Sequence, residues 1–207
     1  MYFNRKCKVT FIAHGATIYT EEARFSDSLN YPPLSELGVE EITNLINYLK
    51  ARGVKNDAIY ASSSVRTAQS AMMISKVFKQ DYNVVEELTT RECGSWNGLT
   101  LEQVQEKYPN GLKYVIENPE KETLAGAESS VAFIERIGKV IDQIVNENIG
   151  NRIIIVTHPE VIQAAICSAL KINADKLPKF YIRTGSATQI SYYEDFASLV
   201  YSDYVPV

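Results

Sequence analysis

The chain contains only two histidines, and each follows a short run of β-branched and apolar residues. His14 comes after residues 9–13, and His158 comes after residues 153–157. Such runs, when a turn residue ends them, are typical of buried strands in a parallel sheet. Ligands of such sheets bind outside the carboxyl ends of the strands. Because histidine exchanges protons near neutral pH, the two positions predict a joint chemical site; the alternative for either one alone is a satisfied core histidine.

A third predicted strand, at residues 57–61, ends at a turn of three serines, residues 62–64. Arg66 lies in the first turn of the helix that is expected to begin after Ser64. A guanidinium beside a helix N-terminus favours a dianionic phosphate. A histidine next to that phosphate can act as nucleophile, and a second can donate hydrogen bonds to the transferring group. The alternative for Arg66 is a surface ion pair.

Strand-like and helix-like segments alternate along the chain, which predicts βαβ units around a mainly parallel sheet. The expected class is α/β, a three-layer α/β/α sandwich in one domain over residues 1–207. From about residue 89 to residue 128 the strand pattern fades, and short amphipathic pieces with prolines and glycines indicate a lid insertion. Further strands are expected at residues 83–88, 187–193 and 198–201, and further helices after Ser35, across residues 131–145 and after His158.

The composition narrows the class of protein. Hydrophobic residues make up 45% and charged residues 22%, as in a globular domain with a sizeable core. The net charge of -4 argues against general binding of nucleic acid or anionic membranes. No signal peptide or membrane span is expected, because residues 1–8 are polar and basic and the apolar run after them is short. Three widely spaced cysteines indicate reduced thiols, so we expect a cytoplasmic protein.

Six short motifs, in order along most of the chain, carry a resemblance to a known family. They are His14-Gly15-Ala16-Thr17, Leu34-Ser35-Glu36-Leu37-Gly38, residues 61–71 around Arg66, Gly94-Ser95-Trp96-Asn97-Gly98, Gly126-Ala127-Glu128-Ser129 with Arg136, and Val156-Thr157-His158. Together they resemble the motifs of the histidine phosphatase superfamily, which includes phosphoglycerate mutases and α-ribazole phosphatase. Each motif alone is weak, whereas six in the same order are specific.

The resemblance implies a phosphoglycerate mutase-like fold and hydrolysis of small phosphomonoesters without metal or cofactor. It makes His14 the nucleophile that becomes phosphohistidine, and it places Arg66 and His158 at the phosphoryl oxygens. Gly15, Thr17 and Ser64 belong to the same motifs and are expected at the phosphate or substrate. The substrate and the oligomeric state stay open.

One departure from the family pattern removes a positive charge. Ala13 stands where the family has an arginine before the nucleophile. Losing one charge-assisted contact to the transferring group costs a few kcal/mol, or roughly a hundredfold in rate. Arg91, Arg183 and Arg24 are the candidates for supplying the missing charge.

Two further departures concern carboxylates. The family's acid maps without gaps onto Thr90, so Glu92, two residues further on, serves as the acid only if the loop is shorter or re-aimed. The family's Gly-Gly after the second histidine is Pro159-Glu160. Glu160 brings a negative charge near the expected phosphate, which is unfavourable unless its side chain points away.

Two functions therefore remain open from the sequence. The first is a phosphomonoesterase that uses His14, with weak activity or an unusual substrate; the presence of His14, Arg66 and His158 favours it. The second is a catalytically impaired relative that binds a phosphorylated ligand or a protein; Ala13 and Thr90 favour it. A metal-dependent hydrolase is disfavoured, because no Asp or Glu cluster accompanies either histidine at ligand spacing.

Overall fold

The computed structural model of this chain describes residues 5–26, 32–121 and 126–206. Residues 27–31, in the loop after the first predicted strand, lie outside the described residues. The same holds for residues 122–125 of the predicted lid insertion.

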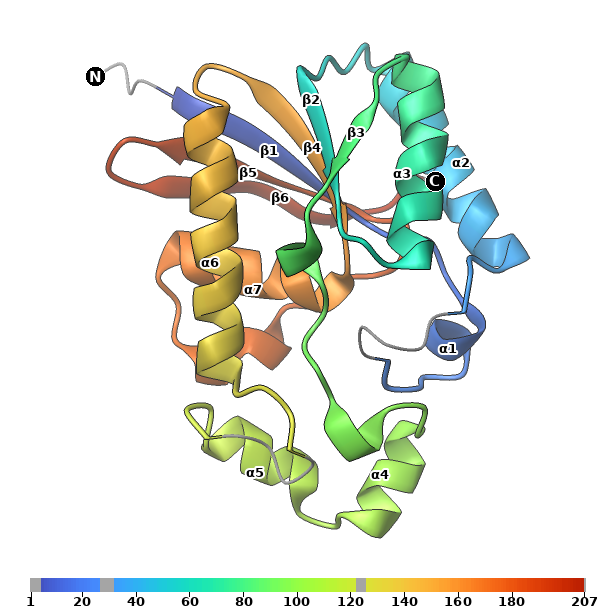
Figure 1. The fold of residues 1–207 in the computed structure, drawn as a ribbon, viewed down its shortest axis with the longest axis vertical. Helices are drawn as coiled ribbons and strands as arrows, with labels where there is room; N and C mark the ends of the chain where they lie inside the picture. Colours follow the sequence, from blue (N-terminus) through green and yellow to red (C-terminus); the bar gives the residue numbers. More distant parts are fainter. Residues whose placement is uncertain (1–4, 27–31, 122–125, 207) are drawn as a thin grey trace.

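A six-stranded sheet forms the middle layer, with the strand order β3-β2-β4-β1-β5-β6 (Figure 1). Strands β3, β2, β4 and β1 run parallel, while β5 and β6 are antiparallel additions at one edge. This arrangement confirms the predicted α/β class with a mainly parallel sheet. The strands are β1 (Arg5–Ala13), β2 (Ala58–Ala61), β3 (Tyr82–Val84), β4 (Arg152–Thr157), β5 (Ala187–Tyr193) and β6 (Ala197–Tyr204).

Helices cover both faces of this sheet. In Figure 1, α6 and α7 lie over one part of the sheet and α2 and α3 over the other, while α4 and α5 lie together at the lower end of the molecule. The helices are α1 (Ile18–Glu21), α2 (Glu36–Ala51), α3 (Val65–Phe78), α4 (Leu101–Lys107), α5 (Gly111–Glu117), α6 (Ser130–Glu147) and α7 (Pro159–Leu170).

The alternation of side chains along β1 divides the core into two clusters. Phe11 points to the cluster shared with α6 and α7, which includes Phe133 and Val161. Ile12, the next residue, points to the cluster shared with α2 and α3, which includes Ile42. Burying one such side chain is worth about 1.5–3 kcal/mol. Side chains on both faces of β1 are therefore packed in the core, and this packing fixes the position of the carboxyl end of the strand.

Two predicted segments differ in the structure. The strand expected at residues 83–88 is shorter, because β3 ends at Val84 and a 3-10 turn at Glu86–Leu88 follows. Leu88 of that turn is fully buried, so packing of one side chain pulls the segment out of the sheet. The stretch from 89 to 121 carries a 3-10 turn at Gly94–Trp96 and the short helices α4 and α5. Its action as a lid remains a prediction.

Candidate active site

The carboxyl ends of β1, β2 and β4 are neighbours in the sheet, and the residues after them meet. The ring centroids of His14 and His158 lie 5.2 Å apart, edge to face at 75°. The Nε of Arg66 lies 3.1 Å from Nε2 of His14. All three side chains are at most 3% exposed. The structure thus brings together the three residues that the strand ends single out.

The hydrogen bonds of His14 define which ring nitrogen carries the lone pair. Nδ1 lies 2.7 Å from the carbonyl oxygen of Gly15, which can only accept, so Nδ1 carries the proton. The Arg66 Nε–H, which can only donate, points at Nε2. Nε2 is therefore an unprotonated nitrogen with an available electron pair. This is the form of imidazole that acts as a nucleophile.

Burial and charge keep His14 in this neutral form. Burial first, and then the nearby Arg66 cation, lower the pKa of His14 to about 3, against a smaller rise caused by the Gly15 hydrogen bond. The pKa of His158 is lowered well below its usual value for similar reasons: burial first, then Arg66, then His14. Both imidazoles are thus neutral near pH 7.

His158 is held through one of its two ring nitrogens. Its Nε2 lies 3.1 Å from the hydroxyl of Ser62 and 3.5 Å from that of Ser64. Its Nδ1 is buried and has no hydrogen-bond partner among the described residues. When Ser62 donates to Nε2, Nδ1 carries the proton and becomes a donor for a ligand. An unpaired buried nitrogen is costly, so its presence beside His14 points to a polar ligand.

Two glycines let α2 pack directly against the loop that follows His14. A Cβ at Gly15 would lie 2.2 Å from the carbonyl oxygen of Gly38, and a Cβ at Gly38 would lie 2.1 Å from that of Ala16. Ser35 caps the helix through the Gly38 N–H, as its position predicts, and its own N–H donates to the Ala16 carbonyl. The start of α2 therefore fixes the loop that holds His14.

His14, Arg66 and His158 line a cavity of about 310 Å³. Its walls come from residues 17–26, from residues 90–96 and from the first turn of α7. Trp96 is buried in one wall and packs edge to face on Phe25, with ring centroids 5.4 Å apart. The start of α7, with N–H groups that favour anions, adjoins His158. The cavity thus combines buried histidines, a guanidinium and a helix N-terminus.

The comparisons with known proteins identify the family of this chain. The sequence profile of the histidine phosphatase superfamily (branch 1) matches residues 9–203. The chain belongs to this superfamily. It is 24% identical over 173 residues to phosphoserine phosphatase 1 of Hydrogenobacter thermophilus, covering 84% of this chain and 81% of that protein.

Solved structures show the same fold. Mycobacterial glucosyl-3-phosphoglycerate phosphatase, solved with VO3, matches with a TM-score of 0.85 and 22% identity, covering 95% of this chain and 98% of that chain. The α-ribazole phosphatase of Shigella flexneri matches with a TM-score of 0.82 and 20% identity, covering 95% of this chain and 96% of that chain.

The other predicted site residues of this histidine phosphatase superfamily member lie in three different places. Thr17, Arg91 and Glu92 line the cavity. Ser64 is the N-cap residue of α3, but its side chain makes no capping hydrogen bond to that helix. Its hydroxyl lies 3.5 Å from Nε2 of His158. Arg183 is not brought to the site: it pairs with Asp203 of β6 and lines a different cavity.

Two of the arginines considered as substitutes for the charge missing at Ala13 line the cavity, and each is paired with a glutamate. Ala13 is fully buried in the core cluster beneath α6 and α7. Its methyl side chain brings no charge to the cavity. Arg24 and Arg91 line the cavity instead. Arg24 is oriented by the Gly98 carbonyl at 2.8 Å and by Glu22. Of the three candidate arginines, two therefore reach the site.

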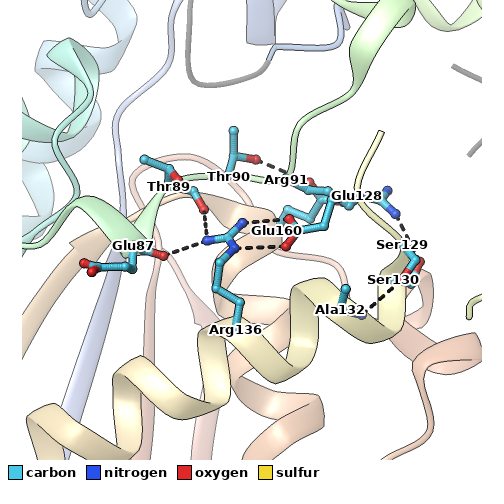
Figure 2. A network of polar contacts seen from close by, with 10 residues as sticks. All are labelled: Glu87, Thr89, Thr90, Arg91, Glu128, Ser129, Ser130, Ala132, Arg136 and Glu160. Atoms are coloured by element: carbon cyan, nitrogen blue, oxygen red, sulfur yellow. Dashed lines mark hydrogen bonds and ion pairs between the residues drawn. The ribbon is translucent and has the colours of Figure 1, made fainter. Parts of the chain in front are cut away.

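The segment that carries Arg91 is held by a polar network (Figure 2). Arg136 of α6 forms a bidentate pair with Glu128 and donates to the backbone carbonyls of Glu87 and Thr89. The Thr157 hydroxyl, at the end of β4, donates to the Leu88 carbonyl. The loop that follows β3 is thus fastened both to α6 and to the strand that carries His158.

Several cavity residues carried no chemical signal in the sequence. Phe25 lies in a loop without a motif, and Gln163 lies one helical turn after Pro159 in α7. Helical spacing from Pro159, four residues earlier, is the one signal that could have found Gln163. Within the described residues, no group of three or more His, Cys, Asp or Glu is placed to hold a metal ion. None of the described helices is long and apolar enough to cross a membrane.

Proposed function

We propose that this chain is a metal-independent phosphomonoesterase that forms a phosphohistidine at His14. One observation carries the proposal. The His14 ring is locked with its proton on Nδ1, and the lone pair on Nε2 faces the Arg66 guanidinium at 3.1 Å in a cavity shared with His158. A neutral, oriented imidazole beside fixed donors is the arrangement that nucleophilic phosphoryl transfer requires.

The contacts give each residue a role. When a phosphate group binds, it displaces the Arg66 Nε–H from Nε2, and the guanidinium then donates to the phosphoryl oxygens. The His158 Nδ1–H donates to another phosphoryl oxygen, while Ser62 holds the opposite ring nitrogen. His14 Nε2 attacks phosphorus as the bond to the leaving oxygen breaks. Water then attacks the phosphohistidine and releases inorganic phosphate.

The expected substrates are small phosphate monoesters. A cavity of about 310 Å³ is at the lower end of the range for ligand pockets, roughly 300–1,000 Å³. The named relatives include phosphatases of phosphoserine and of glucosyl-3-phosphoglycerate, which supports this class. Arg24 and Arg91 at the cavity wall are each paired with a glutamate, so the wall does not by itself select esters with a further anionic group.

A second candidate is a catalytically impaired protein that binds a phosphorylated ligand. The observation that favours it is the buried, uncharged Ala13 next to the nucleophile. Transition-state stabilisation from that position is absent, although ligand binding by Arg66 and His158 does not need it.

The test is steady-state hydrolysis of 4-nitrophenyl phosphate, with and without a chelator, by wild type and His14→Ala. We expect metal-independent turnover that falls at least about a thousandfold in His14→Ala. Equal turnover by both proteins would refute the nucleophilic role. Tight binding of vanadate or phosphate without His14-dependent turnover would establish the second candidate instead.

A further inference from the structure

A second cavity, of about 290 Å³, adjoins the cavity of the two histidines. It lies among α5, the start of α6, the first turns of α7 and the 3-10 turn at Ala174–Lys179. We call this second cavity the α5 groove. Five residues line both cavities: Phe25, Arg91, Trp96, Glu160 and Gln163. A molecule that is too large for the first cavity can therefore extend into the α5 groove.

The side chains that line the α5 groove alone are apolar, apart from Ser130. Three come from one face of α5, at positions 112, 115 and 116, and three come from the 3-10 turn, at positions 174, 177 and 178. Leu177 is 3% exposed and belongs to the core cluster of α6 and α7, whereas Ile116 is 46% exposed. The groove is thus an apolar surface that begins at the core and reaches solvent.

Close packing joins α5 to the wall that the two cavities share. A Cβ at Gly111, the first residue of α5, would lie 2.9 Å from Cζ2 of Trp96, so only a glycine lets the helix start this close to the indole. The Trp96 ring in turn packs on Phe25. The apolar surface is therefore continuous from the shared wall to the side chains of α5.

The polar groups that line the α5 groove are mostly engaged with one another. Arg91 pairs with Glu160 at 2.9 Å and donates to the Ser130 hydroxyl at 3.0 Å (Figure 2). Gln163 donates to the backbone carbonyl at the end of the 3-10 turn. The Trp96 indole N–H, buried and without a partner among the described residues, is a neutral donor. A carboxylate or ammonium group in the groove would therefore lose its water and gain no free counter-charge, which is costly.

We propose that the α5 groove binds the alcohol part of the substrate and that this part is an apolar chain or ring. The inference rests on the proposed function and narrows it: the preferred substrates are phosphate monoesters of apolar alcohols, not of amino acids or sugars. The phosphate lies beside His14, and the alcohol part passes the shared wall at Phe25 and Trp96 into the groove. Each further methylene group that enters the groove should raise kcat/KM about fourfold, which corresponds to about 0.8 kcal/mol.

The alternative is a groove that holds a protein partner and takes no part in substrate binding. In that case the alcohol part of the ester stays in water, and kcat/KM does not change with its length. The dependence of turnover on chain length therefore separates the two occupants.

The experiment measures kcat/KM for ethyl, butyl and hexyl phosphate and for O-phosphoserine in wild type, Ile116→Ser, Ala174→Leu and Ile149→Ser. The three alkyl esters have leaving groups of similar basicity, so chain length changes burial and not the chemistry. Ile149→Ser is a matched control, because Ile149 is an exposed isoleucine that lines neither cavity.

We expect wild type and Ile149→Ser to gain at least about tenfold from ethyl to hexyl phosphate, and to prefer hexyl phosphate to O-phosphoserine. Ile116→Ser makes the groove polar and Ala174→Leu fills it, so both should lose far more on hexyl than on ethyl phosphate. The two variants lie on different elements, so if one does not fold, the other must show this loss.

A wild-type kcat/KM that is flat from ethyl to hexyl phosphate, or highest for O-phosphoserine, overturns the inference. So does a hexyl-to-ethyl ratio in the groove variants that equals the wild-type ratio. Turnover that does not depend on His14 refutes the proposed function instead. Binding of ethyl- and hexylphosphonate, which are not hydrolysed, then tests the groove by itself: affinity should rise with chain length in wild type and less in Ile116→Ser, and equal affinities would overturn the groove.

Discussion

The two histidines should make folding stability depend steeply on mildly acidic pH. Both rings are 2% exposed, and burial together with the Arg66 cation lowers both pKa values, that of His14 to about 3. In the unfolded chain each ring has a pKa near about 6.5. Because the folded pKa values are depressed, the stabilisation is complete above the unfolded pKa and is lost as the pH falls toward the folded values.

The size of the effect follows from proton counting. Below about pH 6 the unfolded chain binds one proton at His14 and the folded chain binds none there, so His14 contributes a slope of about 1.4 kcal/mol per pH unit, and His158 adds a slope of the same sign. Between pH 7 and pH 5 this amounts to about 2 kcal/mol for His14 alone. Stabilities of single domains are only about 5–15 kcal/mol, so the loss is large.

The assay is urea unfolding at pH 7, 6 and 5 for wild type, His14→Gln and His158→Gln. The chain has only these two histidines, so no other side chain has an ordinary pKa within this window. Each variant should lose the part of the wild-type pH slope that its own histidine supplies. A wild-type free energy of unfolding that stays flat from pH 7 to pH 5 would refute the buried, neutral state of the pair. So would variants with an undiminished slope.

Three further substitutions test the parts of the site. Arg66→Lys keeps the charge but loses the planar donors, and kcat/KM for 4-nitrophenyl phosphate should fall at least about a hundredfold. Gly38→Ala forces a Cβ against the Ala16 carbonyl, so it should lower kcat/KM and the urea midpoint together, whereas an unchanged midpoint would contradict the close packing. Arg136→Met removes the Glu128 pair and should cost about 1–3 kcal/mol of unfolding free energy in urea, with a lower kcat/KM.

Much of the fold could be predicted from local sequence pattern. The apolar runs before His14 and His158 form adjacent parallel strands, since short buried strands of this kind pair inside a sheet. The end of β3 could not be predicted in the same way. Residues 83–88 have strand-like composition, but burial of Leu88 and the hydrogen bond from Thr157 turn the chain toward the site. These are tertiary contacts that propensity does not contain.

The charges of the site were the hardest part to predict. The positions of Arg24, Arg91 and Arg183 in the sequence are equally uninformative, because each guanidinium is placed by a partner distant in the chain. Arg183 is drawn to Asp203, twenty residues away on β6, while Arg91 is drawn to Glu160 on α7. Which arginine reaches the cavity of the two histidines is therefore decided by the packing of loops against the sheet.

The most direct measurement is the identification of the phosphorylated residue during turnover. Wild type is mixed with 4-nitrophenyl phosphate, quenched with alkali to preserve phosphohistidine, and mapped by peptide mass spectrometry. We predict one phosphoryl group on the peptide that contains His14 in wild type, and none in His14→Ala. Phosphate on His158, or turnover of wild type without any covalent intermediate, would contradict the assignment of His14 as the nucleophile.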